Sequence, residues 1–252
     1  MIPIFFYCVF IGNGNTMWTD LKPINLGKIQ LIGYPDTKFF KEDYHKKQVV
    51  LHHTISGPSI DGDIESWINN KYNIGTAIII DRAGTPWQLF SSRFWAYHLG
   101  AGNHDLDRHS IGIELDNWGG LTPGNGTLKV FRPERPRIFN WRLKNTSAQK
   151  YYTYYGNAVD VPMQYYPDGF RGYQYYEKYT EAQIRTLGEL LLFWRNKYGI
   201  PLTYNESMWD VSPKALSSVP GVWTHVSYRA DKSDCHPQTE LIEMLKTIQT
   251  LP

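Results

Sequence analysis

Short apolar runs that end in chemically reactive side chains are the feature that most constrains how this chain can fold. The clearest run is Val49-Val50-Leu51, which is followed directly by His52 and His53. An unbroken apolar run of this length is typical of a strand that is covered on both faces of its sheet. The sequence therefore predicts an interior strand that delivers two adjacent histidines at its end.

The elements that follow combine strands with helices. We predict a helix over 59–73 with Ser59 as its N-cap, two strands over 74–90 joined by a turn at 82–84, a strand over 110–119, a helix over 180–198, a strand within 221–229 and a helix over 238–248. The helix from 180 is the most clearly marked, because Thr180 and Gln183 form a capping box and Gly199 ends it. This order indicates an α/β or α+β fold, with helices packed on a sheet.

The chain has 252 residues, which is long for one average domain and short for two. We expect an N-terminal extension at 1–45 that packs on a single domain at 46–252. The apolar stretch at 2–12 has no Lys or Arg before it, and the first basic residue is Lys22. A secretory signal should have a basic start, so we favour a strand or packing segment there.

Residues 120–179 break the pattern of strands and helices. They are rich in Pro, Gly, Asn and above all Tyr, and no regular periodicity is visible. A structureless loop of this length is uncommon inside a compact domain and is usually functional when it is ordered. Tyrosine suits stacking on sugar rings or on a partner. Packing against the parent domain is the alternative, and composition leaves both open.

Charge and cysteine content exclude several classes of protein. The 26 basic and 24 acidic residues give a net charge of only +2, too small for nucleic acid to be the main partner. No segment approaches the roughly 20 apolar residues of a membrane span. Cys8 and Cys235 are the only cysteines, so no disulfide framework is possible and the fold must depend on its core or on a metal.

Three side chains at predicted element ends form a candidate metal site. His52 and His225 each follow a predicted strand, and Asp234 lies nine residues after His225. Zinc in proteins takes His and Asp ligands and keeps an open position when it is catalytic. Each residue is a weak signal alone, but together they predict a zinc site with two histidines and one aspartate. Cys235, directly after Asp234, is an alternative third ligand.

Two more charged residues are candidates for catalysis. Glu114 lies in the apolar strand "SIGIEL", where a buried carboxylate needs a partner or a task. Next to a metal it could serve as a general base. Strand alternation could instead turn it to solvent, and spacing alone does not decide. Lys232, two residues before Asp234, could stabilise a developing oxyanion.

Four motifs in a fixed order carry a family resemblance. The segments "VVLHHTISG", "GTAIIIDRAGTPWQLF", "WAYHLGAGNHDLDRHSIGIELDNWG" and "THVSYRADKSDCHP" resemble the zinc-dependent N-acetylmuramoyl-L-alanine amidases of the type 2 family. That family includes bacterial wall-recycling amidases, phage lysozyme-type amidases and peptidoglycan recognition proteins. The resemblance implies a central mixed β-sheet flanked by helices, with the Tyr-rich stretch at about 120–179 as an insertion.

The resemblance also assigns the metal and the catalytic groups. It implies that His52, His225 and Asp234 hold zinc, with Lys232 as the lysine of the family's Lys-x-Asp spacing. Glu114 matches the catalytic glutamate of the recycling-like branch.

The resemblance further predicts how the substrate is bound. The phage and recognition-protein branch carries a catalytic tyrosine where this chain has Thr76, which favours Glu114 as the catalytic residue. His98 matches a position that lines the substrate cleft. We add Thr76 and Trp95 to the predicted substrate-binding residues, Trp95 as a surface for stacking on sugar.

The implied activity is hydrolysis of the amide bond between N-acetylmuramic acid and L-alanine, with zinc lowering the pKa of its water to about 7. The alternative is a non-catalytic peptidoglycan-binding module, whose known members typically lack the third ligand. We expect a monomer that acts on the cell wall, either in the periplasm or outside the cell, or as a phage endolysin released from the host cytoplasm.

Overall fold

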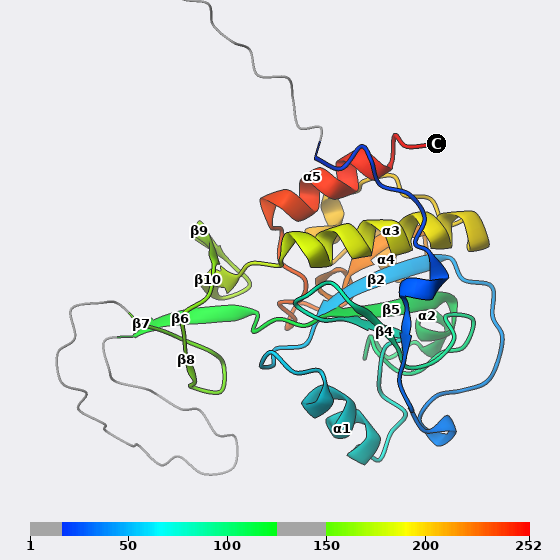
Figure 1. Ribbon diagram of the computed structural model, residues 1–252, viewed down its shortest axis with the longest axis horizontal. Coiled ribbons are helices and arrows are strands. Elements are labelled where there is room, and N and C mark those ends of the chain that lie inside the picture. Colours follow the sequence, from blue (N-terminus) through cyan, green and yellow to red (C-terminus); the bar gives the residue numbers. More distant parts are fainter. Residues whose placement is uncertain (1–16, 125–149) are drawn as a thin grey trace, which may run out of the picture.

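The computed structural model describes residues 17–124 and 150–252 of the chain (Figure 1). The segment predicted at 2–12 and the middle of the Tyr-rich insertion lie outside the described residues. A central six-stranded sheet has the order β1 (Gln30–Leu31), β4 (Pro86–Gln88), β3 (Ile78–Ile80), β5 (Ser110–Leu115), β2 (Gln48–His53) and β11 (Gly221–Thr224).

The direction of the strands makes this sheet mixed. Strand β2 pairs in parallel with β5 on one side and with β11 on the other, and β5 pairs in parallel with β3. Strand β4 returns antiparallel to β3 through the predicted turn at 82–84, where Gly84 has a φ of 84°. Val49, Val50 and Leu51 are fully buried, as expected for a strand covered on both faces. The predicted α+β fold with a central mixed sheet is confirmed.

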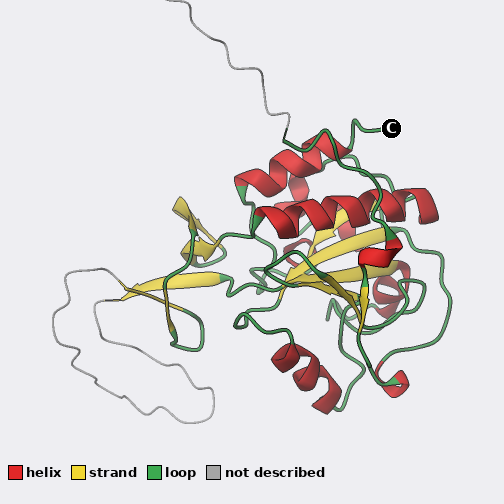
Figure 2. Cartoon of the chain, viewed as in Figure 1, coloured by secondary structure: helices red, strands yellow, loops and turns green. Residues whose placement is uncertain are grey.

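Helices cover both sides of the central sheet (Figures 1 and 2). They are α1 (Asp61–Asn69), α2 (His104–His109), α3 (Glu181–Tyr198), α4 (Pro213–Leu216) and α5 (Thr239–Ile248), with 3₁₀ helices at Leu26–Lys28, Asp36–Lys38, Glu206–Trp209 and His225–Ser227. Helices α3 and α5 lie together on one side, and α1 lies on the other. None of the helices in the described ranges has both the length and the apolar character that a membrane span requires.

The ends of two helices test the predicted caps. At α1 the prediction of Ser59 as N-cap is wrong: Ile60 occupies that position, and the Ser59 hydroxyl accepts a hydrogen bond from the Asp61 amide. At α3 the capping box of Thr180 and Gln183 is present, and Gly199 ends the helix with a left-handed backbone. The apolar face of α3, at Ile184, Leu187, Leu191 and Trp194, is buried.

The Thr180 cap makes a measurable prediction. Its hydroxyl accepts from the Gln183 amide at 3.1 Å and donates to the Arg82 carbonyl at 2.9 Å. We expect Thr180→Ala to lower the free energy of unfolding by about 1 kcal/mol, because the amide loses its partner. Denaturant unfolding measures this, with Thr250→Ala, near the C-terminus, as control. Equal stability of the two variants would contradict the capping role.

The Tyr-rich insertion contains regular strands that no pattern in its sequence predicted. Its described part forms a five-stranded antiparallel sheet in the order β8 (Ala158–Val159), β7 (Lys150–Tyr152), β6 (Gly120–Gly124), β10 (Tyr173–Glu177) and β9 (Met163–Phe170). Aromatic residues favour strands. Between β9 and β10, Arg171 and Gly172 have φ values of 45° and 88°, as a two-residue hairpin turn requires. The predicted domain boundary at residue 46 stays a prediction.

Candidate metal centre and active site

Three parallel strands bring the candidate residues to one edge of the central sheet. His52 on β2 pairs in register with Glu114 on β5. Thr224, the last residue of β11, pairs with Leu51, so His225 follows at the level of His52. The carboxyl ends of parallel strands commonly form binding sites, because side chains from distant parts of the chain meet there.

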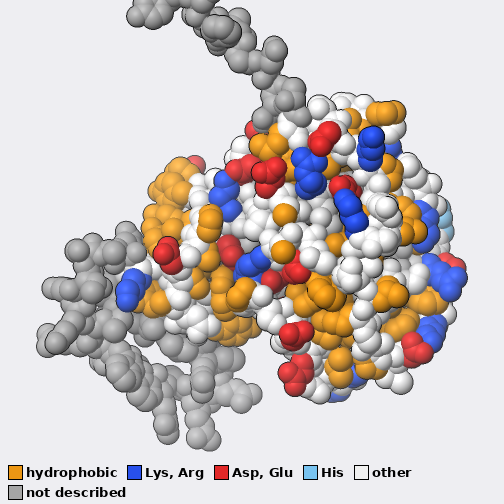
Figure 3. All heavy atoms as spheres, viewed as in Figure 1, with side chains coloured by type: hydrophobic (Ala, Val, Ile, Leu, Met, Phe, Trp, Pro, Cys, Tyr) orange, Lys and Arg blue, Asp and Glu red, His pale blue; other side chains and the backbone are white. Residues whose placement is uncertain are grey.

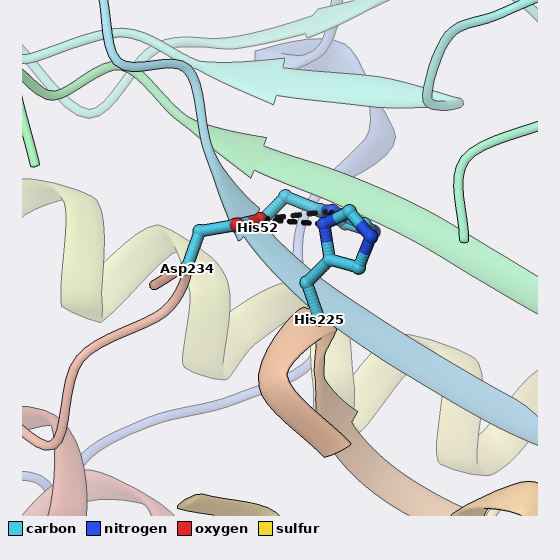
Figure 4. A group of neighbouring side chains, drawn as sticks. All are labelled: His52, His225 and Asp234. Atoms are coloured by element: carbon cyan, nitrogen blue, oxygen red, sulfur yellow. Dashed lines mark hydrogen bonds and ion pairs between the residues drawn. The ribbon is translucent and has the colours of Figure 1, made fainter. Parts of the chain in front are cut away.

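Asp234 reaches the same edge from the loop that follows the 3₁₀ helix His225–Ser227. The Val226 amide donates to the Asp234 carbonyl at 3.1 Å and holds this loop in place. Asp234 Oδ2 lies 2.9 Å from His225 Nδ1 and 3.2 Å from His52 Nδ1, and the two histidine nitrogens are 3.0 Å apart. Figure 4 shows the three side chains converging on one point, and all three are buried.

The protonation of these groups fits a bound cation. His225 Nε2 lies 2.9 Å from the Leu99 carbonyl, which can only accept, so Nε2 carries the proton. The Nδ1 of a neutral His225 is then bare and faces the Asp234 carboxylate. Burial would raise the pKa of Asp234, but the charge and hydrogen bond of His225 and the hydrogen bond of His52 hold it well below 3.8. Two atoms that can both accept, 2.9 Å apart, are satisfied by a cation between them, either a proton on Nδ1 or a metal ion.

The donor set also matches a particular class of metal. Burial lowers the pKa of His52 to about 4, with the charge of His225 acting in the same direction. His52 is therefore neutral near pH 7 and can offer a lone pair. Two imidazole nitrogens and one carboxylate oxygen are a common ligand set for zinc, and three protein ligands leave a position for water or substrate. Within the described residues, this is the group of side chains that could hold a metal ion.

Glu114 is buried beside this group and does not face solvent. Its Oε2 has no hydrogen-bond partner among the described residues. Burial raises the pKa of Glu114 well above 4.5, the charges of Asp234 and Asp63 raise it further, and the charge of Lys232 opposes them. A bound cation would also oppose the rise. The alternation that left two orientations open in the sequence is decided here by burial: β5 lies between β2 and β3 inside the sheet, and Glu114 is only 8% exposed.

Lys232 approaches the centre from the loop that carries Asp234. Its side chain is half-buried, and no hydrogen bond or ion pair engages its ammonium group within the part of the chain that the structure describes. Its charge lowers the pKa values of both His52 and Glu114, so it lies within electrostatic reach of both. An unengaged cation at this place can stabilise a developing negative charge.

The neighbours in the sequence, Cys235 and His53, do not join the group of ligands. Cys235 is fully buried, and burial raises the pKa of its thiol well above 9.0, which disfavours the thiolate that metals bind. The structure therefore brings Asp234, not Cys235, to the two histidines. His53 points away, with Nδ1 2.9 Å from the Tyr179 hydroxyl, because successive side chains of a strand lie on opposite faces.

The predicted substrate-binding residues lie in different settings. Trp95 is only 3% exposed: its ring stacks on Phe40 at 4.1 Å, Arg108 lies over it, and its Nε1 donates to Glu42. The prediction that Trp95 stacks on sugar is therefore wrong for this structure, because its ring is already covered. Thr76 is buried, and its hydroxyl donates to the Ile78 carbonyl at 3.3 Å; its substrate role stays a prediction.

His98 is only partly buried, but both of its ring nitrogens are engaged. Nδ1 lies 3.0 Å from His52 Nε2, and Nε2 lies 2.8 Å from the Ser110 hydroxyl. Its role in the substrate cleft also stays a prediction. Sequence reasoning did not find Ser110 or the Leu99 carbonyl, because nothing in their spacing distinguishes them; only the fold brings them to the histidines. The most exposed tyrosines of the insertion are Tyr154, Tyr155 and Tyr165.

On the face seen in Figure 3, acidic and basic side chains are interspersed.

A family model described as N-acetylmuramoyl-L-alanine amidase matches residues 43–237. The chain is similar to the structure of PlyL, with 14% identity over 86% of this chain and 96% of that chain and a TM-score of 0.48.

Two further solved structures are similar at comparable levels. One is the endolysin amidase LysCS from Clostridium intestinale URNW, with 15% identity, 85% and 92% of the two chains covered and a TM-score of 0.42. The other is a selenomethionine derivative of AmpD, with 14% identity, coverage of 89% and 98% and a TM-score of 0.44. No curated protein matches the chain. The family match spans most of the chain and all the residues brought together at the strand edge, and the chain therefore belongs to the N-acetylmuramoyl-L-alanine amidase family, type 2.

Proposed function

We propose that this chain is a zinc-dependent peptidoglycan hydrolase that cleaves the amide bond between N-acetylmuramic acid and the L-alanine of the stem peptide, and so acts on the cell wall. The observation that carries the proposal is the convergence of His52, His225 and Asp234, whose ligand atoms lie 2.9–3.2 Å apart, at a strand edge that also holds Glu114. Membership in the amidase family supports the same bond as the target.

Each residue has a separate task in this reaction. Zinc held by the two histidines and Asp234 would act as a Lewis acid and lower the pKa of its water to about 7. Glu114 takes a proton from the attacking water and delivers it to the amide nitrogen as the carbon–nitrogen bond breaks. Lys232 stabilises the negative charge that develops on the carbonyl oxygen. The products are a lactyl carboxylate on the sugar and a free amine on L-alanine.

A muropeptide digest tests the bond that is cleaved. We expect the zinc-loaded enzyme to release new L-alanine amine termini, and we expect a chelator to abolish this release and added zinc to restore it. Binding without any release would indicate a non-catalytic recognition module. New termini within the stem peptide would indicate a peptidase that uses the same ligands. Mass spectrometry of the products separates the three results.

Metal content tests the ligand set directly. We expect His52→Ala to lose stoichiometric zinc, because the remaining two ligands do not hold the ion against a competing chelator. His45→Ala is the matched control, since His45 is exposed and its side chain makes no hydrogen bond within the described ranges. Atomic absorption after dialysis is the measurement. Full zinc content in His52→Ala would contradict the assignment.

A further inference from the structure

A chain of hydrogen bonds runs from the candidate zinc ligand His52 into the protein. His52 Nε2 lies 3.0 Å from His98 Nδ1, and His98 Nε2 lies 2.8 Å from the Ser110 hydroxyl. Ser110 is the first residue of β5, and its hydroxyl lies 2.6 Å from the Leu106 carbonyl. Four polar groups are therefore connected in series, and the series ends on a backbone carbonyl.

The last group decides the direction of every bond in this series. The Leu106 carbonyl can only accept, so the Ser110 hydroxyl donates its one hydrogen there. Ser110 must then accept from His98 Nε2–H. The Nδ1 of a neutral His98 is left bare and accepts from His52 Nε2–H. The Nδ1 of His52 is consequently bare, and this is the nitrogen that faces His225 and Asp234.

Leu99, the residue after His98, sets the position of the proton on the second histidine, His225. The Leu99 carbonyl accepts from His225 Nε2–H at 2.9 Å, which leaves His225 Nδ1 bare toward the same point. One dipeptide, His98-Leu99, thus orients both histidine ligands: the first by its side chain and the second by its backbone. His52 lies in β2 and His225 directly follows β11, far apart in the sequence, and this segment contacts both.

Two features hold the dipeptide in place. Asp107 Oδ1, in α2, accepts from the amides of both His98 and Leu99, each at 3.0 Å. A Cβ atom at Gly112 would lie only 3.0 Å from the His98 ring and 2.8 Å from the Thr76 methyl group, so the ring fills the space that this glycine leaves. The His98 ring therefore has little freedom to turn away from His52.

We propose that the His98-Leu99 segment, anchored by Ser110 and Asp107, is the positioning device that sets the tautomers of both histidine ligands and turns two bare Nδ1 atoms to the metal. The inference rests on the proposed function, because it requires the zinc site. Partners behind a metal-bound histidine typically change metal affinity by about 10- to 100-fold when they are removed. His98 and Ser110 act through His52 and are not themselves ligands.

The test measures zinc affinity by competition with a chromogenic chelator. We expect Ser110→Ala and His98→Leu to raise the zinc dissociation constant by about 10- to 100-fold. We expect His98→Gln to lose less zinc affinity than His98→Leu, because a glutamine amide can accept from His52 and donate to Ser110. Ser92→Ala is the matched control: Ser92 is also buried and bonded to another side chain, the Tyr198 hydroxyl, at 2.9 Å.

Nitrogen-15 NMR of the zinc-free protein gives a readout that does not depend on activity. We expect the wild-type His52 ring to carry its proton on Nε2 and the Ser110→Ala variant to show a mixture of tautomers. Wild-type zinc affinity and an unchanged His52 tautomer in Ser110→Ala, with thermal unfolding showing that it is folded, would overturn the inference and leave the proposed function standing. A wild-type protein that binds no zinc would overturn both.

Discussion

Replacing Glu114 by Gln is expected to lower kcat by about 10²- to 10⁴-fold while zinc stays bound, the range that general acid–base catalysis contributes. Glutamine keeps the shape of the side chain but cannot take a proton from water or deliver one to the amide nitrogen. Glu114 is not among the converging ligand atoms, so the metal content should not change. Rates on a defined muropeptide and zinc content measure the two effects separately.

The same substitution should not destabilise the protein. In the zinc-free protein the pKa of Glu114 is raised above its usual 4.5, so the folded state binds the proton more tightly and loses stability as the pH rises above that value. Glu114→Gln removes this loss, and its free energy of unfolding should equal or exceed that of the wild type at about pH 8.

Asp63→Asn is the control for Glu114→Gln. Burial raises the pKa of Asp63 to about 6, and its carboxyl accepts from the Ser56 hydroxyl at 2.8 Å. Its loss should leave kcat within a few-fold of the wild type, because it lies in α1, not on the strand edge, and acts on Glu114 only through its charge. An unchanged kcat in Glu114→Gln would exclude Glu114 as the general base.

Replacing Arg82 by Met is expected to lower the free energy of unfolding by about 3–5 kcal/mol, the cost of leaving buried carboxylates without their partner. Arg82 lies in the turn between β3 and β4. Its guanidinium contacts Asp116 Oδ1 at 2.5 Å, and forms a two-bond pair with Glu177 at 2.9 and 3.0 Å. Asp116 follows β5 and Glu177 ends β10, so this arginine joins the central sheet to the inserted sheet.

The environment of the two carboxyls explains the size of the effect. The Asp116 side chain is fully buried, and that burial raises its pKa to about 7 even though Arg82 opposes the rise. Without the arginine both carboxylates must be protonated or hydrated on folding. Arg82→Met should therefore lower the free energy of unfolding more at about pH 8 than at about pH 5. At the lower pH the carboxyls can be protonated, and a neutral carboxyl does not need a cationic partner.

Denaturant unfolding at the two pH values is the measurement. Arg185→Met is the control, because the pair of Arg185 with Asp20 is exposed and should contribute at most about 1 kcal/mol. If Arg82→Met cost no more than Arg185→Met, the two sheets would be held together by other contacts.

Local patterns in the sequence were enough to predict most elements of the central domain. The unbroken run before His52 predicted a doubly covered strand, and the capping box at Thr180 predicted the start of α3; both are present. The same rules missed the inserted sheet. Most of its strands have five residues or fewer, and β6 pairs with the distant β10, so no local periodicity marks the sheet as a whole.

Some features of the candidate site could likewise be predicted from the sequence, and others could not. The residue types of the candidate metal centre could be identified in the sequence, because two histidines, an aspartate and a nearby lysine lie at or near the ends of predicted elements. Whether Glu114 faces solvent was not readable, since alternation describes which residues share a face and not what covers that face. Trp95 illustrates the opposite error: an aromatic beside a motif looks available, but Phe40 and Arg108 cover it.

By itself, the sequence predicted the family, the central sheet and the residues from which a metal site could be built, because these depend on residue types and on spacing along the chain. The tertiary structure alone decided that Asp234 and not Cys235 meets the histidines, that Glu114 is buried, and that His98 and Leu99 orient both rings. Those outcomes depend on hydrogen-bond direction and on burial between strands brought together only by folding. The proton on each histidine follows from carbonyl groups that no sequence pattern identifies.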